Sequence, residues 1–201
     1  MTTDSGDPLG PDPEHDITLD AAALRVLAHP MRLVMLNALR ERGPSTARRM
    51  AKELELDSGA ASYHLRRLAA GGLIEEDQER GTRRDRWWRA RHHRSYHDPA
   101  TAAPDERQGS RAYTNAVVLG YGDQLRRLAA VVPLFPDDWF EASIFSDYTI
   151  SLTPDELNEM KRELVGVIDK YRTRGAGSDA EPTSGTESAT VSVQLQMFPR
   201  L

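Results

Sequence analysis

Residues 56–74 read LDSGAASYHLRRLAAGGLI, and this stretch decides the fold of the chain. Ala61, Leu65 and Leu68 recur at the spacing of one helix face, so we expect a helix that buries these three side chains. Gly71–Gly72 ends this helix. The opposite side carries small and basic residues, namely Gly59, Ala60, Ser62, Tyr63, Arg66 and Arg67, with His64 at the border. A helix with such a slim outer face can approach another surface closely.

The residues upstream predict three more helices. Two helical segments lie within 19–42, and the second is apolar on most of its sides, as is typical of a helix at the centre of a core. Pro30 fits the first turn of that second helix, and Gly43–Pro44 ends it. Ser45 is the expected N-cap of a third helix, TARRMAKELEL at 46–56.

A basic hairpin follows these helices. The segments LIEEDQ (73–78) and DRWWRAR (85–91) predict two short strands around the turn RGTR (80–83). Asp57 or Ser58 is expected to cap the helix before them. Helix, turn, helix and hairpin together describe a winged helix-turn-helix. The small residues let the backbone of its second helix approach base edges in the major groove of DNA, which is roughly 12 Å wide.

The expected DNA contacts fall into three groups. Ser62 and Tyr63 offer hydrogen bonds to bases, and the basic side chains suit phosphates, guanine or the minor groove. The recognition helix contributes Ser58, Gly59, Ala60, Ser62, Tyr63, His64, Arg66 and Arg67. The wing contributes Arg80, Thr82, Arg83, Arg84 and Arg86, and the helix before the turn contributes Ser45 and Thr46.

Charge is unevenly distributed along the chain. The formal net charge is −5, but residues 18–98 hold 16 Lys and Arg against 11 Asp and Glu, whereas the remainder holds 10 against 20. The segment with the helix-turn-helix pattern is therefore basic and suited to a polyanion. The acidic remainder is expected to stay away from DNA phosphates.

Residues 27–90 resemble the winged-helix domain of ArsR-type bacterial transcriptional regulators. The resemblance covers about one third of the chain and rests on an ensemble of residues: His29–Pro30 and Arg32 at a helix start, Ala51 and Leu54 before the turn, Ser62, His64, Leu65 and Leu68 in the recognition helix, Gly72–Leu73–Ile74, and Gly81 in the wing. It implies a homodimer on a pseudo-palindromic operator, repressing until an effector releases it.

The composition and motifs of the chain exclude several kinds of ligand site and active site. The absence of cysteine excludes disulfides, a Cys nucleophile and thiolate metal sites, so any effector is expected to be a small organic molecule. His92, His93 and His97 lie between a strand and a linker and are not expected to bind a metal. The sequence contains no Gly-rich phosphate loop, no His/Glu metal pair on a helix and no nucleophile elbow. We therefore expect no enzyme and no cofactor.

Residues 111–201 are expected to form a dimerisation or effector module. Alternating residues predict strands at 148–152 and 191–198, and Thr153–Glu156 is a capping box that opens a helix. Because two strands alone are marginally stable, a second copy of the chain is expected to complete the sheet. A helix at 111–132 carries an apolar stripe suited to a partner helix, formed by Tyr113, Val117, Tyr121, Leu125 and Leu128.

The predicted fold class is mainly α with α+β character, a winged helix-turn-helix joined to a small helix-and-strand module. The predicted parts are a disordered leader (1–17), the winged domain (18–96), a linker (97–110) and a C-terminal region (111–201) with a flexible loop at 174–189. No segment approaches the roughly 18 apolar residues of a membrane span, and the N-terminus is unlike a secretory signal. These features predict a cytoplasmic, nucleoid-associated protein without a membrane partner.

The expected function is that of a homodimeric, sequence-specific transcriptional regulator that binds double-stranded DNA and acts as a repressor. The alternative is a winged-helix module that binds a protein partner instead of DNA. Tyr63, Arg66 and Arg67 favour the first reading, because a recognition face with these side chains suits phosphates and bases.

Overall fold

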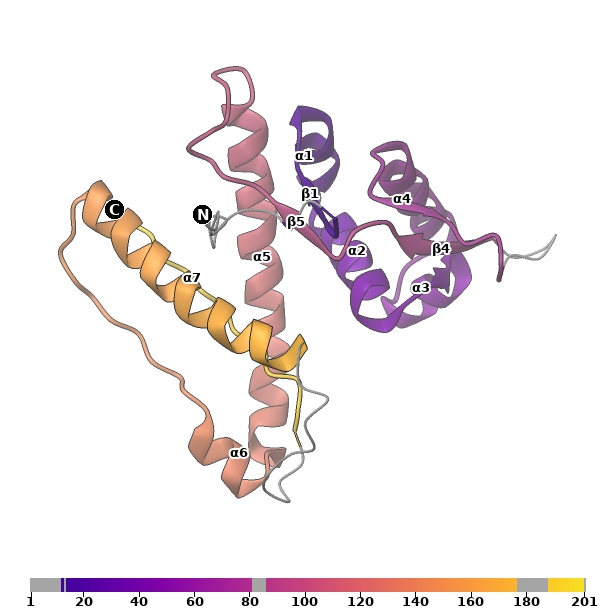
Figure 1. Ribbon diagram of the computed structural model, residues 1–201. Helices are drawn as coiled ribbons and strands as arrows, with labels where there is room; N and C mark the ends of the chain where they lie inside the picture. Colours follow the sequence, from indigo (N-terminus) through magenta and orange to yellow (C-terminus); the bar gives the residue numbers. More distant parts are fainter. Residues whose placement is uncertain (1–11, 13, 81–85, 177–187, 201) are drawn as a thin grey trace, which may run out of the picture. The chain divides into compact units, whose positions relative to one another are not determined.

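The computed structural model describes residues 12, 14–80, 86–176 and 188–200. Contacts divide the chain into two units, one of residues 11–140 and one of residues 141–201 together with 1–10. In Figure 1 the first unit runs from the indigo helices to the long pink helix, and the second contains the orange helix.

The first unit is mostly helical, with short strands between its helices. Its elements are, in chain order, β1 (Asp16–Thr18), α1 (Ala21–Leu27), α2 (Pro30–Arg42), β2 (Ser45–Thr46), α3 (Ala47–Glu53), α4 (Ser58–Ala70), β3 (Ile74–Glu76), β4 (Trp87–Ala90), β5 (Arg94–Tyr96), α5 (Arg107–Val131) and η1 (Val132–Leu134). Helix α6 (Asp137–Ala142) follows η1. The predicted helices α1 to α4 and the two strands of the hairpin are all present, so the winged helix-turn-helix is confirmed.

A three-stranded antiparallel sheet closes the helix-turn-helix. Strand β4 lies between β3 and β2, with Ile74 opposite Ala90 and Ser45 opposite Trp88. The prediction that Ser45 caps α3 is wrong, because Ser45 belongs to β2. Thr46 is the N-cap instead, and its Oγ1 accepts a hydrogen bond from the backbone N–H of Arg49 at 3.3 Å.

A second, parallel pair of strands joins the start of the unit to the segment after the hairpin. Strand β1 pairs with β5, with Asp16 opposite Arg94. The Arg94 guanidinium donates to both carboxylate oxygens of Asp16, at 2.6 and 3.1 Å. The predicted disordered leader is therefore wrong for residues 16 and 17, which this pairing orders, while residues 1–11 and 13 lie outside the described part.

One hydrophobic core holds α1 to α4 together. Ala61, Leu65 and Leu68 are each 0% exposed, which confirms the predicted inner face of α4. Trp88 on β4 is buried and anchors the sheet to this core, while its neighbour Trp87 is half-buried. The largest fully buried side chains are Leu24, Leu27, Met35, Leu36, Met50, Leu65, Leu68, Leu73 and Ile74.

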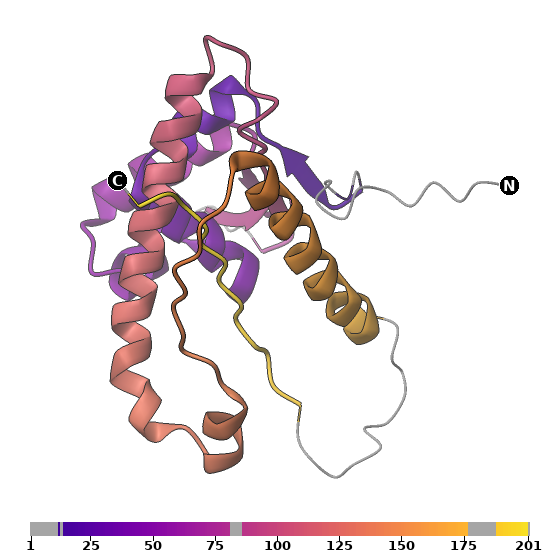
Figure 2. The same cartoon turned by 90° about the vertical axis from the view of Figure 1, so that its left-hand side faces the viewer.

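The long helix α5 packs its first turns against α1 and α2. Ser110 and Ala116 are buried there, and Ser110 Oγ lies 2.7 Å from His97 Nε2. The helix begins at Arg107, so the last four residues of the predicted 97–110 linker are helical. Its later turns extend past the helix-turn-helix in both views (Figure 1, Figure 2).

The second unit centres on helix α7 (Pro154–Ala176). The predicted capping box is confirmed: Thr153 N–H donates to Glu156 Oε2 at 2.7 Å, and Glu156 N–H donates to Thr153 Oγ1 at 3.3 Å. These hydrogen bonds favour the carboxylate and lower the pKa of Glu156. The helix runs into the predicted loop at 174–189, of which residues 177–187 lie outside the described part.

The strands predicted at 148–152 and 191–198 are wrong for this structure. Both segments are extended but form no ladder within the described residues (Figure 2). Tyr148 remains 80% exposed and Val193 63% exposed. Alternation of apolar residues specifies a surface that suits a strand, but strand formation also requires a neighbouring edge and a buried face.

The cap of α4 yields a test of the fold. Asp57 Oδ1 accepts hydrogen bonds from the N–H groups of Gly59 and Ala60 at 2.8 and 3.1 Å. We expect Asp57→Ala to lower the free energy of unfolding by roughly 0.5–2 kcal/mol, because two helix N–H groups lose their acceptor. Urea unfolding measures this change. Asp57→Asn keeps an acceptor oxygen and is the control; an equal loss in both variants would contradict the capping role.

Candidate nucleic-acid interface

The turn before α4 fixes the direction of this helix. Leu56 N–H donates to Ala51 O at 2.8 Å, and Glu55 adopts a φ of 53° in the left-handed region that favours glycine. Asp57 then caps α4. The helix is thereby held against α3 on one side and leaves the opposite side to solvent.

The outward side of α4 matches the predicted recognition surface. Tyr63 is 52% exposed, and Arg66 and Arg67 are also exposed. Ala60, Ser62 and His64 are half-buried at its edges, while Ser58 and Gly59 are exposed at the start of the helix. The structure thus brings together on one helix all eight residues that the sequence predicts for this surface.

Two cations on this surface have no acidic partner within the described residues. Arg66 Nε donates to Ser62 O of its own helix, at 3.2 Å. Neither Arg66 nor Arg67 forms an ion pair with a carboxylate of the described residues. Unpaired arginines on an exposed helix face are available to an anion from outside the chain.

In contrast to Arg66 and Arg67, the described arginines of the wing form ion pairs with carboxylates. Arg86 Nε lies 3.0 Å from Glu76 Oε2, and Arg80 Nε lies 3.6 Å from Asp77 Oδ2. Arg86 also lies over the ring of Trp88, 5.6 Å from its centroid. The other predicted wing contacts, Thr82, Arg83 and Arg84, lie outside the described residues.

Ser45 and Thr46 occupy a different position from the predicted one. Their side chains are only 8% and 4% exposed, because β2 lies against β4. Thr46 caps α3 within the fold, and the expected contact of Ser45 and Thr46 with DNA stays a prediction. Beside them, the Arg49 guanidinium lies over the ring of Trp87 at 4.5 Å, a contact that sequence reasoning missed.

His64 lies where α4 meets the start of α2. Its ring centroid is 4.8 Å from that of His29 and 5.5 Å from that of Tyr63. Burial lowers the pKa of His64, and the neighbouring His29 and Arg32 lower it further. His29 and Arg32 come from more than 30 residues upstream, so no spacing pattern in the sequence places them beside the recognition helix.

The other histidines take up separate structural positions. The ring of His93 stacks on that of His15 at a centroid distance of 4.9 Å, and His97 contacts Ser110. Burial lowers the pKa of His92 and of His97. Among the described residues, no three His, Asp or Glu side chains are gathered so that they could hold a metal ion.

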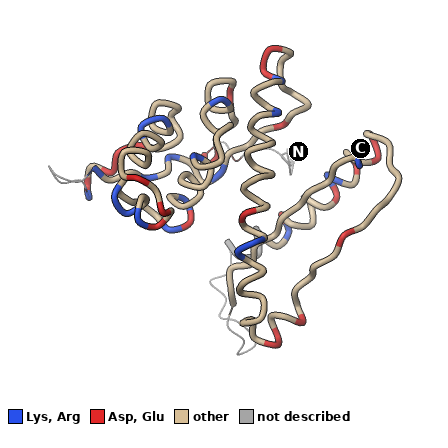
Figure 3. The backbone as a smooth tube through the Cα atoms, turned by 180° about the vertical axis from the view of Figure 1, so that it is seen from behind, with Lys and Arg blue, Asp and Glu red and all other residues tan. Residues whose placement is uncertain are grey.

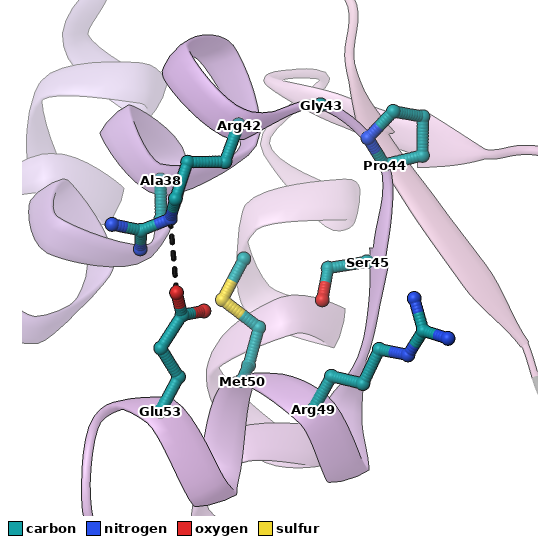
Figure 4. Close-up of a pocket in the computed structure, with 8 residues that line it drawn as sticks. All are labelled: Ala38, Arg42, Gly43, Pro44, Ser45, Arg49, Met50 and Glu53. Carbon is teal, nitrogen blue, oxygen red and sulfur yellow. Dashed lines mark ion pairs between the residues drawn. The ribbon is translucent and has the colours of Figure 1, made fainter.

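A small pocket lies between the end of α2 and helix α3 (Figure 4). Its volume is about 190 Å³, which is below the roughly 300 Å³ at which pockets for drug-sized ligands begin. Arg42 and Glu53 face each other across it, with 3.1 Å between Nε and Oε1. A pocket of this size suits water or a small ion better than an organic effector.

The predicted dimerisation stripe on α5 is divided between two environments. Tyr113 packs against the core of its own unit and lies edge-on to His97, and burial raises the pKa of its hydroxyl. Tyr113 is half-buried by its own chain, and its place in a dimer interface stays a prediction. Val117, Tyr121 and Leu128 are half-buried, and Leu125 is exposed. Further exposed apolar residues of this region are Val118, Leu119, Val131 and Leu134.

Charge along the described backbone is mixed. Figure 3 shows basic and acidic segments alternating over the helices of the winged domain. The difference between surfaces therefore lies in pairing: the arginines of the sheet face carboxylates, whereas those of α4 do not. Among the described helices, none has the length and apolar character required to span a bilayer.

Comparison with known proteins agrees with this geometry. A family model described as a helix-turn-helix domain matches residues 27–77. Residues 27–77 are a helix-turn-helix domain. The match supports a DNA-binding transcriptional regulator.

A solved MarR family regulator from Neisseria meningitidis is similar at 16% sequence identity and a TM-score of 0.30, over 72% of this chain and 79% of that one. No curated protein matches the chain.

The buried histidines make folding stability depend on pH. The unfolded chain takes up protons on His64 at an ordinary pKa of about 6.5, but the folded chain does so only at lower pH. Stability should therefore be fullest above about pH 7.5 and fall as the pH drops through the unfolded value. We expect His64→Gln to make this fall shallower in urea unfolding at a series of pH values. A variant curve parallel to the wild-type curve would contradict a lowered pKa of His64.

Proposed function

We propose that this chain is a sequence-specific DNA-binding repressor that acts as a homodimer on a pseudo-palindromic operator. The observation that carries the proposal is the outer side of α4, on a helix-turn-helix domain. There, small residues accompany an exposed tyrosine and two arginines that form no ion pair with a carboxylate of the described residues. A helix of this kind fits the major groove, and its side chains suit base edges and phosphates.

The roles of the α4 side chains follow from their chemistry. Tyr63 carries a hydroxyl that can donate to or accept from a base, and Ser62 adds a second. Arg66 and Arg67 supply charge that neutralises phosphates and releases counterions. The wing arginines are proposed to contact the backbone or the minor groove beside the same site.

Dimerisation is proposed to use the later turns of α5. Val118 and Leu119 are each 52% exposed, and Leu125 is 47% exposed. Val118 and Leu125 are seven residues apart and share one helix face. A self-complementary apolar face of this kind is covered by a two-fold related copy, which also places two recognition helices roughly 10 bp apart.

Repression and its release by an effector rest on the resemblance to ArsR-type regulators. In such proteins an effector releases the operator, and we assign effector binding to residues 111–201. The effector is proposed to be an organic molecule, because the chain has no thiolate for a soft metal. The protein is placed in the cytoplasm, at the nucleoid.

The first test separates phosphate contacts from base contacts, using a sequence selected from random or genomic DNA. We expect Arg66→Ala and Arg67→Ala to weaken binding to all duplexes, and to reduce the salt slope by about one unit for each lost contact. Tyr63→Phe and Ser62→Ala should relax the preference at particular bases by about 1–3 kcal/mol per lost contact. Anisotropy titrations with selected and scrambled duplexes measure both effects.

Arg25→Ala on α1 is the matched control for these changes, because it removes one exposed arginine that is not among the residues predicted to contact DNA. Equal binding of wild-type protein to selected and scrambled duplexes would refute the regulator and favour a winged-helix module that binds a protein partner.

The second test concerns α5. We expect Leu125→Glu, alone or with Val118→Glu, to shift the full chain from dimer to monomer, since a charge on the apolar face is costly to bury. Sedimentation velocity measures the state. Ala130→Glu adds the same charge to another face of α5 and should leave the dimer intact. Wild-type protein that sediments as a monomer would contradict the proposed dimer.

A further inference from the structure

A cationic cluster lies beside the recognition helix, where the start of α2 meets α4. It consists of His29, Arg32, His64 and Arg67. His29 and His64 are in ring contact, and Arg32 lies close enough to both His64 and Arg67 for their charges to act on one another. Burial lowers the pKa of Arg32, and Arg67 lowers it further.

The cluster lacks any compensating acid. The groups whose charges act on His64 are His29 and Arg32, both from the start of α2; α1, α3 and β3 also pack against α4 but contribute none within the described residues. Those acting on Arg32 are Arg67 and Tyr63. Four basic groups thus meet, and no carboxylate of the described part of the chain accompanies them.

Two buried nitrogen atoms of the cluster also form no hydrogen bond within the described residues. Arg32 Nε and His64 Nδ1 are shielded from solvent and have no hydrogen-bond partner among the described residues. Buried polar atoms are nearly always hydrogen-bonded, so each such atom calls for an explanation. The arginines of β4 differ, since Arg89 Nε donates to Glu75 Oε1 at 2.8 Å.

The two histidines are not equivalent. His29 Nδ1 accepts a hydrogen bond from the N–H of Met31 at 3.2 Å, which caps α2 and requires a free lone pair on that nitrogen. His64 Nδ1 makes no hydrogen bond within the described residues, so this nitrogen can gain a proton without the loss of one.

We propose that Arg32 binds a phosphate of the DNA backbone beside the recognition helix, and that His64, in ring contact with His29, couples this contact to pH. The inference rests on the proposed function and adds to the interface a residue from α2, outside the helix-turn-helix pair. A phosphate supplies the negative charge that the cluster lacks, and its oxygens accept from an arginine fork.

DNA affinity is expected to depend on pH, because phosphate binding and proton uptake at His64 favour each other. Free protein holds the pKa of His64 below its ordinary value, and a phosphate bound nearby raises it. DNA binding therefore takes up a proton at each His64. Affinity is fullest below the free pKa and is lost as the pH rises through the value in the complex. When two protomers bind one duplex, two protons are taken up, one at each His64.

The test uses the full chain with a duplex selected by the wild-type protein. We expect Arg32→Ala to weaken binding about tenfold or more, and to reduce the salt slope by about one unit per protomer. Arg32→Lys keeps the charge without the fork and should retain most of the salt slope. Arg25→Ala is the control for loss of one arginine.

A second arm measures the same affinities between about pH 5.5 and 8, around the ordinary histidine pKa. Wild-type affinity should rise as the pH falls, and His64→Gln, which can hydrogen-bond but not titrate, should remove most of this rise. The titration of the His64 ring, followed by NMR with and without duplex, should shift to higher pH in the complex. This readout does not depend on any loss of affinity.

The outcomes separate the two proposals. Wild-type protein that does not distinguish the selected duplex would overturn the regulator itself. The phosphate contact is refuted if the wild-type protein prefers the selected duplex but Arg32→Ala binds it as tightly as Arg25→Ala does. Circular dichroism shows whether Arg32→Ala is folded. If it is not, Arg32→Gln is compared with Arg25→Ala in the same way. A wild-type pH profile in His64→Gln refutes the coupling.

Discussion

The inner face of α4 is the constraint on which the rest of the winged domain depends. Ala61, Leu65 and Leu68 are completely buried, so the rotation of the helix about its axis is fixed. At 3.6 residues per turn, that choice of inner face sends Tyr63, Arg66 and Arg67 outward. Burial of three apolar side chains therefore determines which polar side chains an approaching duplex would meet.

Helix α2 connects this recognition surface to the remainder of the unit. It packs against α1, α4, α5 and β4, and its buried Met35 and Leu36 lie in the shared core. The N-cap of α2, His29, lies in ring contact with His64 of α4, and α2 also packs against α5. Helix α2 therefore connects α4 to α5 through one packed core.

Electrostatic function in this chain depends on pairing more than on net charge. The net charge is −5, which by itself disfavours DNA. The arginines of β4 and β5 face glutamates and Asp16, and exposed pairs of this kind contribute little to stability. Arg32, Arg66 and Arg67 face none within the described residues. These three arginines are therefore available to an anion from outside the chain.

Several features could be predicted because they are local. The ends of α2 and α4, the cap at Asp57 and the capping box at Thr153 depend on residues within one turn of each other, and all four are present as expected. The hairpin followed from two short alternating segments and a turn. Ser45 and Thr46 could not be assigned correctly, because pairing with β4, more than 40 residues later, decides their burial.

By itself, the sequence determined the helices, the inner face of α4 and the exposed residues of the recognition surface, since these depend on periodicity and on capping by near neighbours. Tertiary structure alone decided that Tyr113 joins the core of its own unit, that residues 148–152 remain without a strand partner, and that Arg32 lies beside Arg67. Each of these depends on segments distant in the chain, and side-chain spacing carries no information about which distant segments meet.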